Sequence, residues 1–210
     1  MRSPPRLIRV GLTGGIAAGK SAVAELWRDK GAAVIDADVL AREALATGTP
    51  THAAVVREFG NSIVNADGSI NRAALGEIVF QNEERRRTLN GLVHPIVRQK
   101  QQEMLAALER AEGVAVVVIP LLYEVGAEQE FDCIVTVACS EWTQRARLAA
   151  KGFDENQTSA RIAAQWPMAT KMDRADYVIW NDGSRRILAE QAGIIWNNIK
   201  ETYHAARQTP

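Results

Sequence analysis

Short hydrophobic runs alternate along the chain with longer segments in which hydrophobic positions recur at helical spacing. Strand-like runs separated by helical segments are typical of strand–helix–strand units and a parallel sheet. Because the runs are hydrophobic almost throughout, both faces of the sheet are expected to be covered by helices. The pattern predicts an α/β fold with a five-stranded parallel sheet flanked by helices, the strands lying at 8–13, 32–36, 114–120, 133–138 and 177–181.

Two helical regions interrupt this alternation. The segment between the second and third runs is longer than one crossover helix requires, so an insertion is predicted there. Within it, Asn71 is expected to cap a helix over 71–80, and a second helical segment covers 83–110. Pro95 is predicted to begin a helix or to kink one. Another helical patch, rich in basic residues, covers 141–166.

Composition narrows the class of protein. Of the 210 residues, 47% are hydrophobic and 24% are charged, as expected for a globular protein. The 25 basic and 25 acidic residues cancel, which argues against a nucleic-acid partner. The N-terminus does not resemble a signal peptide and no run is long enough to span a membrane, so a cytoplasmic location without membrane contact is expected. Cys133 and Cys139 are predicted to be reduced thiols in the core.

The segment after the first run carries the clearest chemical signal. Residues 14–21 read Gly-Gly-Ile-Ala-Ala-Gly-Lys-Ser and match the phosphate-loop pattern G-x-x-x-x-G-K-[ST] between a strand and a helix. Backbone amides of such a loop bind phosphate groups, the lysine reaches the β- and γ-phosphates, and the serine hydroxyl binds Mg²⁺. The fold is therefore predicted to be of the P-loop NTPase type, with Ser21 as the metal ligand. The predicted nucleotide-binding residues are Gly14, Gly15, Ile16, Ala17, Ala18, Gly19, Lys20, Ser21 and Ala22.

Two aspartates follow the second run. Asp36 and Asp38 are expected at the carboxyl edge of the sheet, where open α/β sheets bind ligands. An aspartate there can accept a proton from an acceptor hydroxyl or help to hold Mg²⁺. Either one can instead cap the helix that follows.

Several segments, taken in order, resemble the dephospho-CoA kinase family. They are "GLTGGI", "GKS", "VIDADVLAR", "DGSINRAAL", "HPIV", "IPLLYE", "ARIAAQ" and "RADYVIWNDGS". The resemblance implies ATP-dependent phosphorylation of the ribose 3'-hydroxyl of dephospho-CoA, the last step of coenzyme A synthesis, with Mg²⁺ as cofactor. It also implies three parts: a core of about 6–40, 113–140 and 173–208, a helical CoA-binding insertion of about 41–112, and a lid of about 141–172.

The resemblance further implies roles for individual residues. The implied catalytic residues are Asp38 as general base, Lys20, and Arg147 of the lid. The implied substrate-binding residues are Asp38, Arg42, His94, Pro95, Leu121, Leu122 and Glu124. Each has a simpler alternative, since a histidine can cap a helix, a glutamate can pair with a cation, and an arginine can lie on a solvated helix face.

The chain departs from the usual pattern of the family inside the phosphate loop. Ala17 and Ala18 stand where the family commonly has glycine and serine, and Ala22 where it has threonine. The Cβ atom of Ala17 disfavours a positive φ angle, and Ala22 lacks a hydroxyl for the α-phosphate. Lys151 stands where a second lid arginine is common, and lysine lacks the bidentate fork of arginine.

Two other classes of protein remain as alternatives. A nucleoside or nucleoside-monophosphate kinase shares the loop, the lid and a helical insertion, and differs in its acceptor pocket. A regulatory GTPase is a more distant alternative, because the segment "YVIWNDGS" lacks the lysine of a guanine-reading motif. The sequence does not determine the oligomeric state.

Overall fold

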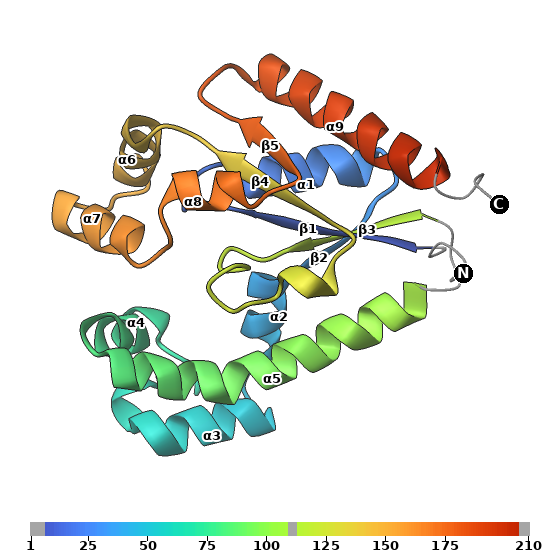
Figure 1. The fold of residues 1–210 in the computed structure, drawn as a ribbon. Helices are drawn as coiled ribbons and strands as arrows, with labels where there is room; N and C mark the ends of the chain where they lie inside the picture. The colour runs from blue at the N-terminus through green and yellow to red at the C-terminus, as the bar shows by residue number, and fades with distance from the viewer. Residues whose placement is uncertain (1–6, 109–112, 206–210) are drawn as a thin grey trace. The chain divides into compact units, whose positions relative to one another are not determined.

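The computed structural model describes residues 7–108 and 113–205. It consists of two compact units, Met1–Ile35 with Leu108–Pro210 and Asp36–Ala107 (Figure 1). Parts of the expected core and insertion lie outside the described residues, namely residue 6, residues 109–112 and residues 206–208. The predicted helix end at Arg110 also lies outside them.

A five-stranded sheet forms the centre of the first unit. Its strands are β1 (Leu7–Gly14), β2 (Ala33–Asp36), β3 (Gly113–Val118), β4 (Cys133–Ala138) and β5 (Tyr177–Trp180). Their order is β2-β3-β1-β4-β5, and β1 pairs in parallel with both β3 and β4 while β4 pairs in parallel with β5. The predicted strands agree with the observed ones to within two residues at either end. The predicted parallel sheet with flanking helices is therefore confirmed.

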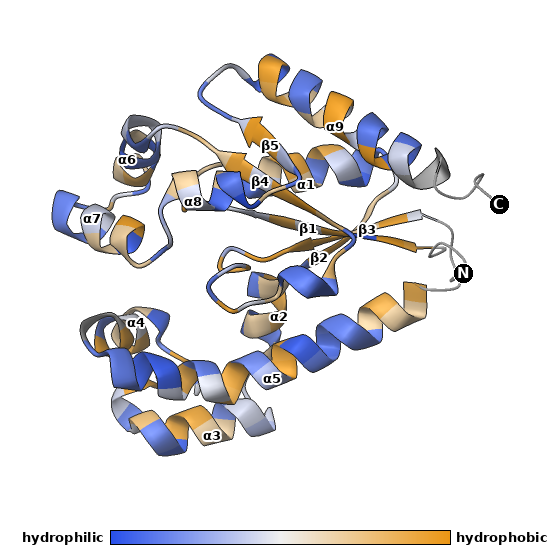
Figure 2. Cartoon of the chain, viewed as in Figure 1, coloured by the Kyte–Doolittle hydropathy of each residue, from blue (hydrophilic) through white to orange (hydrophobic). Residues whose placement is uncertain are grey.

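Helices α1 (Lys20–Asp29) and α9 (Arg185–Ala205) cover one face of this sheet. Figure 2 shows hydrophobic and hydrophilic bands alternating along α9, as expected for a helix that buries one face. Trp27 of α1 is fully buried, and its Nε1–H donates to the Ala192 carbonyl at 2.9 Å. Its ring centroid lies 6.1 Å from that of Trp196. These contacts fix the helix that begins at the phosphate loop.

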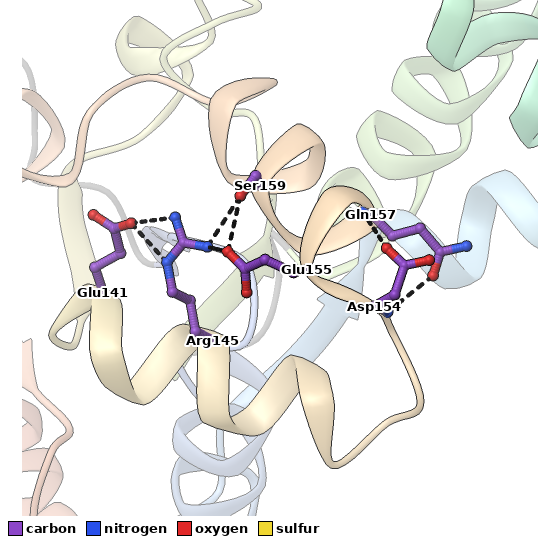
Figure 3. A network of polar contacts seen from close by, with 6 residues as sticks. All are labelled: Glu141, Arg145, Asp154, Glu155, Gln157 and Ser159. Atoms are coloured by element: carbon purple, nitrogen blue, oxygen red, sulfur yellow. Dashed lines mark hydrogen bonds and ion pairs between the residues drawn. The ribbon is translucent and has the colours of Figure 1, made fainter.

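The predicted helical patch 141–166 is divided into α6 (Glu141–Ala149) and α7 (Glu155–Ala163), and a further short helix, α8 (Met168–Asp173), follows it. Gly152, with a φ of 85°, lies between α6 and α7, and Asp154 begins α7 with a capping box. Arg145 of α6 pairs with Glu141 at 2.6 Å and with Glu155 of α7, and it donates to Ser159 at 3.0 Å (Figure 3). The two helices are thus joined by one guanidinium group.

The second unit is helical. It contains α2 (Ala37–Ala44), α3 (Pro50–Phe59), the 3₁₀ turn Asn61–Ile63, α4 (Arg72–Gln81) and most of α5 (Glu83–Leu108). Its hydrophobic core includes Val55, Phe59, Ile63, Ile70, Leu75 and Val93. The prediction that Asn71 caps a helix is confirmed, because its side chain accepts from the Ala74 N–H at 3.1 Å.

Pro95 lies inside α5, so the expectation that a helix begins there is wrong. A proline in a helix interior loses one backbone hydrogen bond and crowds the preceding turn. Hydrophobic residues before and after it, Val93 and Val97, pack in the same cluster. Packing therefore continues across the proline and holds the helix together. Neither α5 nor any other helix in the described ranges is both long and hydrophobic enough to cross a membrane.

Cys133 and Cys139 are buried free thiols, as predicted. Burial, together with the charges of Asp176 and Asp132, raises the pKa of Cys133 from 9.0 to about 12. Because the unfolded thiol ionises first, this residue contributes stability below about pH 9 that is lost as the pH rises towards 12.

We therefore expect Cys133 to resist alkylation in the folded protein. Since the thiolate is the reactive form, iodoacetamide at pH 8 should leave Cys133 unmodified in buffer and modify it in denaturant. Peptide mass spectrometry measures this. Equal modification under both conditions would contradict the burial of this thiol.

Candidate nucleotide site

The phosphate loop joins β1 to α1, and packing allows only glycine at its two ends. A Cβ atom on Gly14 would lie 2.0 Å from the Val137 carbonyl oxygen of β4. Gly19 has a φ of 109°, and a Cβ atom there would lie 2.2 Å from Asn181 Nδ2. The loop is therefore pressed against β4 and against the residue that follows β5.

The phosphate loop leads into the N-terminus of α1, which has no side-chain cap from its N-cap residue. Gly19 is the N-cap residue of α1 and has no side chain that could cap the first turn. The free N–H groups at a helix N-terminus and the helix dipole favour an anion. Ser21, in this turn, is exposed. Binding of phosphate groups by this turn stays a prediction.

Lys20 folds over the loop. Its Nζ donates to the Gly14 carbonyl at 3.0 Å and to the Gly15 carbonyl at 2.8 Å. These two bonds keep an ammonium group beside the backbone amides of the loop. A cation there can offset charge on a transferring phosphoryl group.

Four side chains from the last third of the chain hold the loop. Arg147 of α6 donates to the carbonyls of Ala17 at 3.0 Å and Ala18 at 3.2 Å, and to the carbonyl of Asn181 at 2.8 Å. The Asn181 amide donates to the Ala18 carbonyl at 2.7 Å. Two glutamines contact Ile16: Gln144 Nε2 donates to its carbonyl at 2.9 Å, and Gln165 Oε1 accepts from its N–H at 2.7 Å.

Sequence reasoning identified only Arg147 among these four residues. The structure brings it to the nucleotide loop, not to a solvated helix face. Gln165 ends the segment "ARIAAQ" and Asn181 lies in "YVIWNDGS", two of the segments that carry the resemblance. The resemblance of those segments to the family could have pointed to Gln165 and Asn181. Gln144 lies in none of the segments that carry the resemblance.

Ala17 adopts a φ of 58°, the only positive φ of a non-glycine residue in the described ranges. An L residue in the left-handed region is disfavoured by contact between its Cβ atom and the backbone. The chain thus keeps the conformation of a glycine position while carrying an alanine there.

Glu124, predicted to bind substrate, forms a buried ion pair. Its Oε1 lies 2.7 Å from Nζ of Lys171, whose side chain has no exposed surface, and it accepts from the Trp166 N–H at 2.8 Å. Lys171 also donates to the Pro120 carbonyl at 3.1 Å. The alternative of a salt-bridge partner therefore holds for Glu124. Of the two leucines before it, Leu122 is buried and Leu121 is partly exposed.

The remaining predicted residues lie in the second unit. Asp36 caps α2, with its side chain accepting from the N–H groups of Asp38 at 2.8 Å and Val39 at 3.3 Å. Asp38 and Arg42 are exposed and four residues apart on α2, so they share one face of the helix. His94 and Pro95 are exposed on α5. The capping alternative is thus realised by Asp36, which leaves Asp38 the stronger candidate for chemistry.

The strain at Ala17 can be measured. We expect Ala17→Gly to raise the free energy of unfolding by about 0.5 to 1 kcal/mol, because relief of the left-handed strain exceeds the added freedom of the unfolded chain. Ala18→Gly is the matched control. Ala18 is fully buried and has no positive φ, so its substitution should lower the free energy of unfolding. Denaturant unfolding compares the two, and a loss of stability in Ala17→Gly would contradict the strain.

Comparison with known proteins places these features in a family. The family model described as dephospho-CoA kinase matches residues 8–186. The chain is 47% identical over 180 residues to the dephospho-CoA kinase of Geobacillus kaustophilus, which covers 85% of this chain and 90% of that protein. The protein TT1252 of Thermus thermophilus has a similar crystal structure, with a TM-score of 0.78, 34% identity, and coverage of 92% of this chain and 96% of that one.

A second solved structure, the dephospho-CoA kinase from Campylobacter jejuni, has a TM-score of 0.70 and 25% identity, and the match covers 93% of this chain and 98% of that one. Sequence and fold thus agree over most of the chain. The protein belongs to the dephospho-CoA kinase family.

Proposed function

We propose that this protein transfers the γ-phosphoryl group of ATP to the ribose 3'-hydroxyl of dephospho-CoA, giving CoA and ADP. Membership of the family supports the acceptor. The observation that supports ATP as the phosphoryl donor is the N-terminus of α1, which has no side-chain cap and has Lys20 beside it. A nucleoside or nucleoside-monophosphate kinase is not favoured by the family, and neither is a regulatory GTPase.

In this proposal the loop residues 14–22 bind the phosphates of ATP. The amides of the first turn of α1 orient the phosphate chain, and Lys20 offsets charge on the transferring group. Arg147 keeps the phosphate loop in place for ATP, because it donates hydrogen bonds to the carbonyls of Ala17 and Ala18.

Mg²⁺ fits the donor set that the loop offers. The Ser21 hydroxyl is exposed in the first turn of α1, and one protein oxygen is a sufficient contribution because phosphate oxygens and water complete the coordination of Mg²⁺. The bound ion would neutralise charge between the β- and γ-phosphates. The chain itself supplies the hydroxyl and its fixed position.

The second unit and the helices after β4 provide the other parts. Arg42, His94 and Pro95 of the second unit are proposed to contact dephospho-CoA, and Leu121 of the first unit is proposed as a further contact. Because Leu122 is buried and Glu124 pairs with Lys171, these two residues are proposed to hold the segment that carries Leu121. The lid comprises residues 141–172. This proposal is supported by the ion pairs of Arg145, which join α6 to α7 and allow both helices to move as one body.

Asp38 is the proposed general base. A ribose hydroxyl is a poor nucleophile at neutral pH, and a carboxylate within hydrogen-bond reach can orient it and accept its proton. Because phosphoryl transfer has a loose transition state, orientation of the hydroxyl is the larger part of this role. The exposed position of Asp38 in the first turn of α2, with capping left to Asp36, supports the assignment.

The acceptor is tested by a coupled ADP-release assay. We expect Mg²⁺-dependent ADP release with dephospho-CoA at a kcat/KM far above that with nucleosides or nucleoside monophosphates, and a product carrying a 3'-phosphate by mass spectrometry. Lys20→Ala should lower turnover by orders of magnitude with the fold retained. A higher kcat/KM with a nucleoside monophosphate would overturn the proposal.

The base is tested by two matched substitutions. Asp38→Asn removes the charge at constant size, and we expect kcat to fall by roughly 10²-fold or more while ATP binding changes less. Asp36→Asn keeps a good capping side chain, so α2 should persist and kcat should change little. Steady-state kinetics and calorimetric ATP titration measure both. If Asp36→Asn showed the large loss and Asp38→Asn did not, the roles of the two aspartates would be exchanged.

A further inference from the structure

One peptide group of the phosphate loop, between Gly15 and Ile16, is held from both sides. Its carbonyl accepts from Lys20 Nζ at 2.8 Å, and its N–H donates to Gln165 Oε1 at 2.7 Å. A peptide group is planar, so the direction of the N–H fixes the direction of the carbonyl. Gln165 and Lys20 are therefore coupled through a single rigid unit.

The chemistry of the contact defines which atom of Gln165 is used. A backbone N–H is only a donor, so its partner must be the amide oxygen and not the nitrogen. The bond also polarises the peptide group, which makes the Gly15 carbonyl a better acceptor for the ammonium group. Loss of this oxygen would weaken the hold on Lys20 without removing any atom that contacts Lys20.

The neighbouring backbone has little room to compensate. Gln144, which is buried, donates to the Ile16 carbonyl, and a Cβ atom on Gly15 would lie 2.4 Å from both Gln144 Nε2 and Met168 Cε. The following peptide group is thus fixed by Gln144. The Gly15 carbonyl also accepts from the Ala18 N–H at 3.2 Å, and Gln165 holds the opposite, N–H side of the Gly15–Ile16 peptide group.

Gln165 is itself held at the end of the segment that carries α7. The next residue, Trp166, donates its N–H to Glu124 at 2.8 Å, and its ring stacks with that of Tyr123 at a centroid distance of 6.3 Å. Glu124 in turn pairs with the buried Lys171. The ion pair between Glu124 and Lys171 therefore helps to set the position of Gln165.

We infer that Gln165 is a positioning residue for phosphoryl transfer, which holds the Gly15–Ile16 peptide group and through it the ammonium group of Lys20. The kinetic part of this inference rests on the proposed function. The side chain connects the helical segment after β4 to the lysine that acts on the phosphates, although it touches no reacting atom in this assignment.

The test replaces Gln165 by Leu, which removes the acceptor oxygen at similar size. Asn197→Leu is the matched control, because Asn197 is exposed on α9, outside the proposed lid, and its side chain has no hydrogen-bond partner in the described ranges. In Gln165→Leu we expect kcat to fall by roughly 10-fold to 100-fold, with a smaller change in the KM for ATP, since the lysine is misplaced and not removed. Asn197→Leu should keep the wild-type kcat.

A second readout follows Lys20 without catalysis. Amine labelling with acetic anhydride, read by mass spectrometry against the exposed Lys30, should modify Lys20 roughly twofold to tenfold faster in Gln165→Leu, as expected for the loss of one hydrogen bond. Gln165→Glu keeps an acceptor oxygen at the same side-chain length. Its Lys20 should therefore be labelled no faster than in the wild type.

The two readouts separate this inference from the proposed function. If the wild type failed to phosphorylate dephospho-CoA while the labelling pattern held, the activity would be wrong and the coupling would stand. If labelling of Lys20 were the same in Gln165→Leu as in the wild type, the coupling would be overturned. A folded Gln165→Leu protein with the kcat of Asn197→Leu would overturn the positioning role, and Gln165→Ala repeats the test if the leucine variant does not fold.

Discussion

Backbone polar groups of a buried or half-buried loop need partners, and the phosphate loop finds many of them far away in the sequence. A loop that must offer amides to a ligand cannot use regular secondary structure for this purpose. Here the carbonyls of residues 14–18 accept from Lys20, Gln144, Arg147 and Asn181, and the Ile16 N–H donates to Gln165. The last third of the chain thus determines the shape of its first loop.

This arrangement accounts for which residues the loop can tolerate. Gly14 and Gly19 are fixed by contacts with Val137 and Asn181, whose positions follow from β4 and β5 in the parallel sheet. Ala17 has no such clash and bears only the intrinsic strain of its φ of 58°. Backbone strain in a functional loop persists where the surrounding structure holds the strained conformation. Here the two hydrogen bonds from Arg147 to the Ala17 and Ala18 carbonyls hold it.

The strands, the phosphate loop and the cap at Asn71 could be predicted because they depend on local pattern. Each hydrophobic run is long enough for one strand, and the loop motif lies within eight residues, 14–21. Of the two expectations for Pro95, a helix start or a kink, the helix start was wrong because a local rule ignores the packing of Val93 and Val97 on either side. Gln144 and Gln165 could not be found locally, since they contact a residue 128 and 149 positions away. The choice between Asp36 and Asp38 as cap needed the hydrogen-bond geometry.

The buried pair of Lys171 and Glu124 shows the same dependence on distant contacts. Removing two charges from water costs free energy that their attraction only partly returns, so such a pair is weak evidence for stability and better evidence for a specific arrangement. Lys171 also donates to the Pro120 carbonyl, and Thr136 of β4 donates to the Lys171 carbonyl at 3.2 Å. The pair therefore connects the segment after β3, the strand β4 and the helix α8. A hydrophobic pair of equal volume would fill the same space, but it would not fix the oxygen that receives the Trp166 N–H and so would not fix Gln165 beside the phosphate loop.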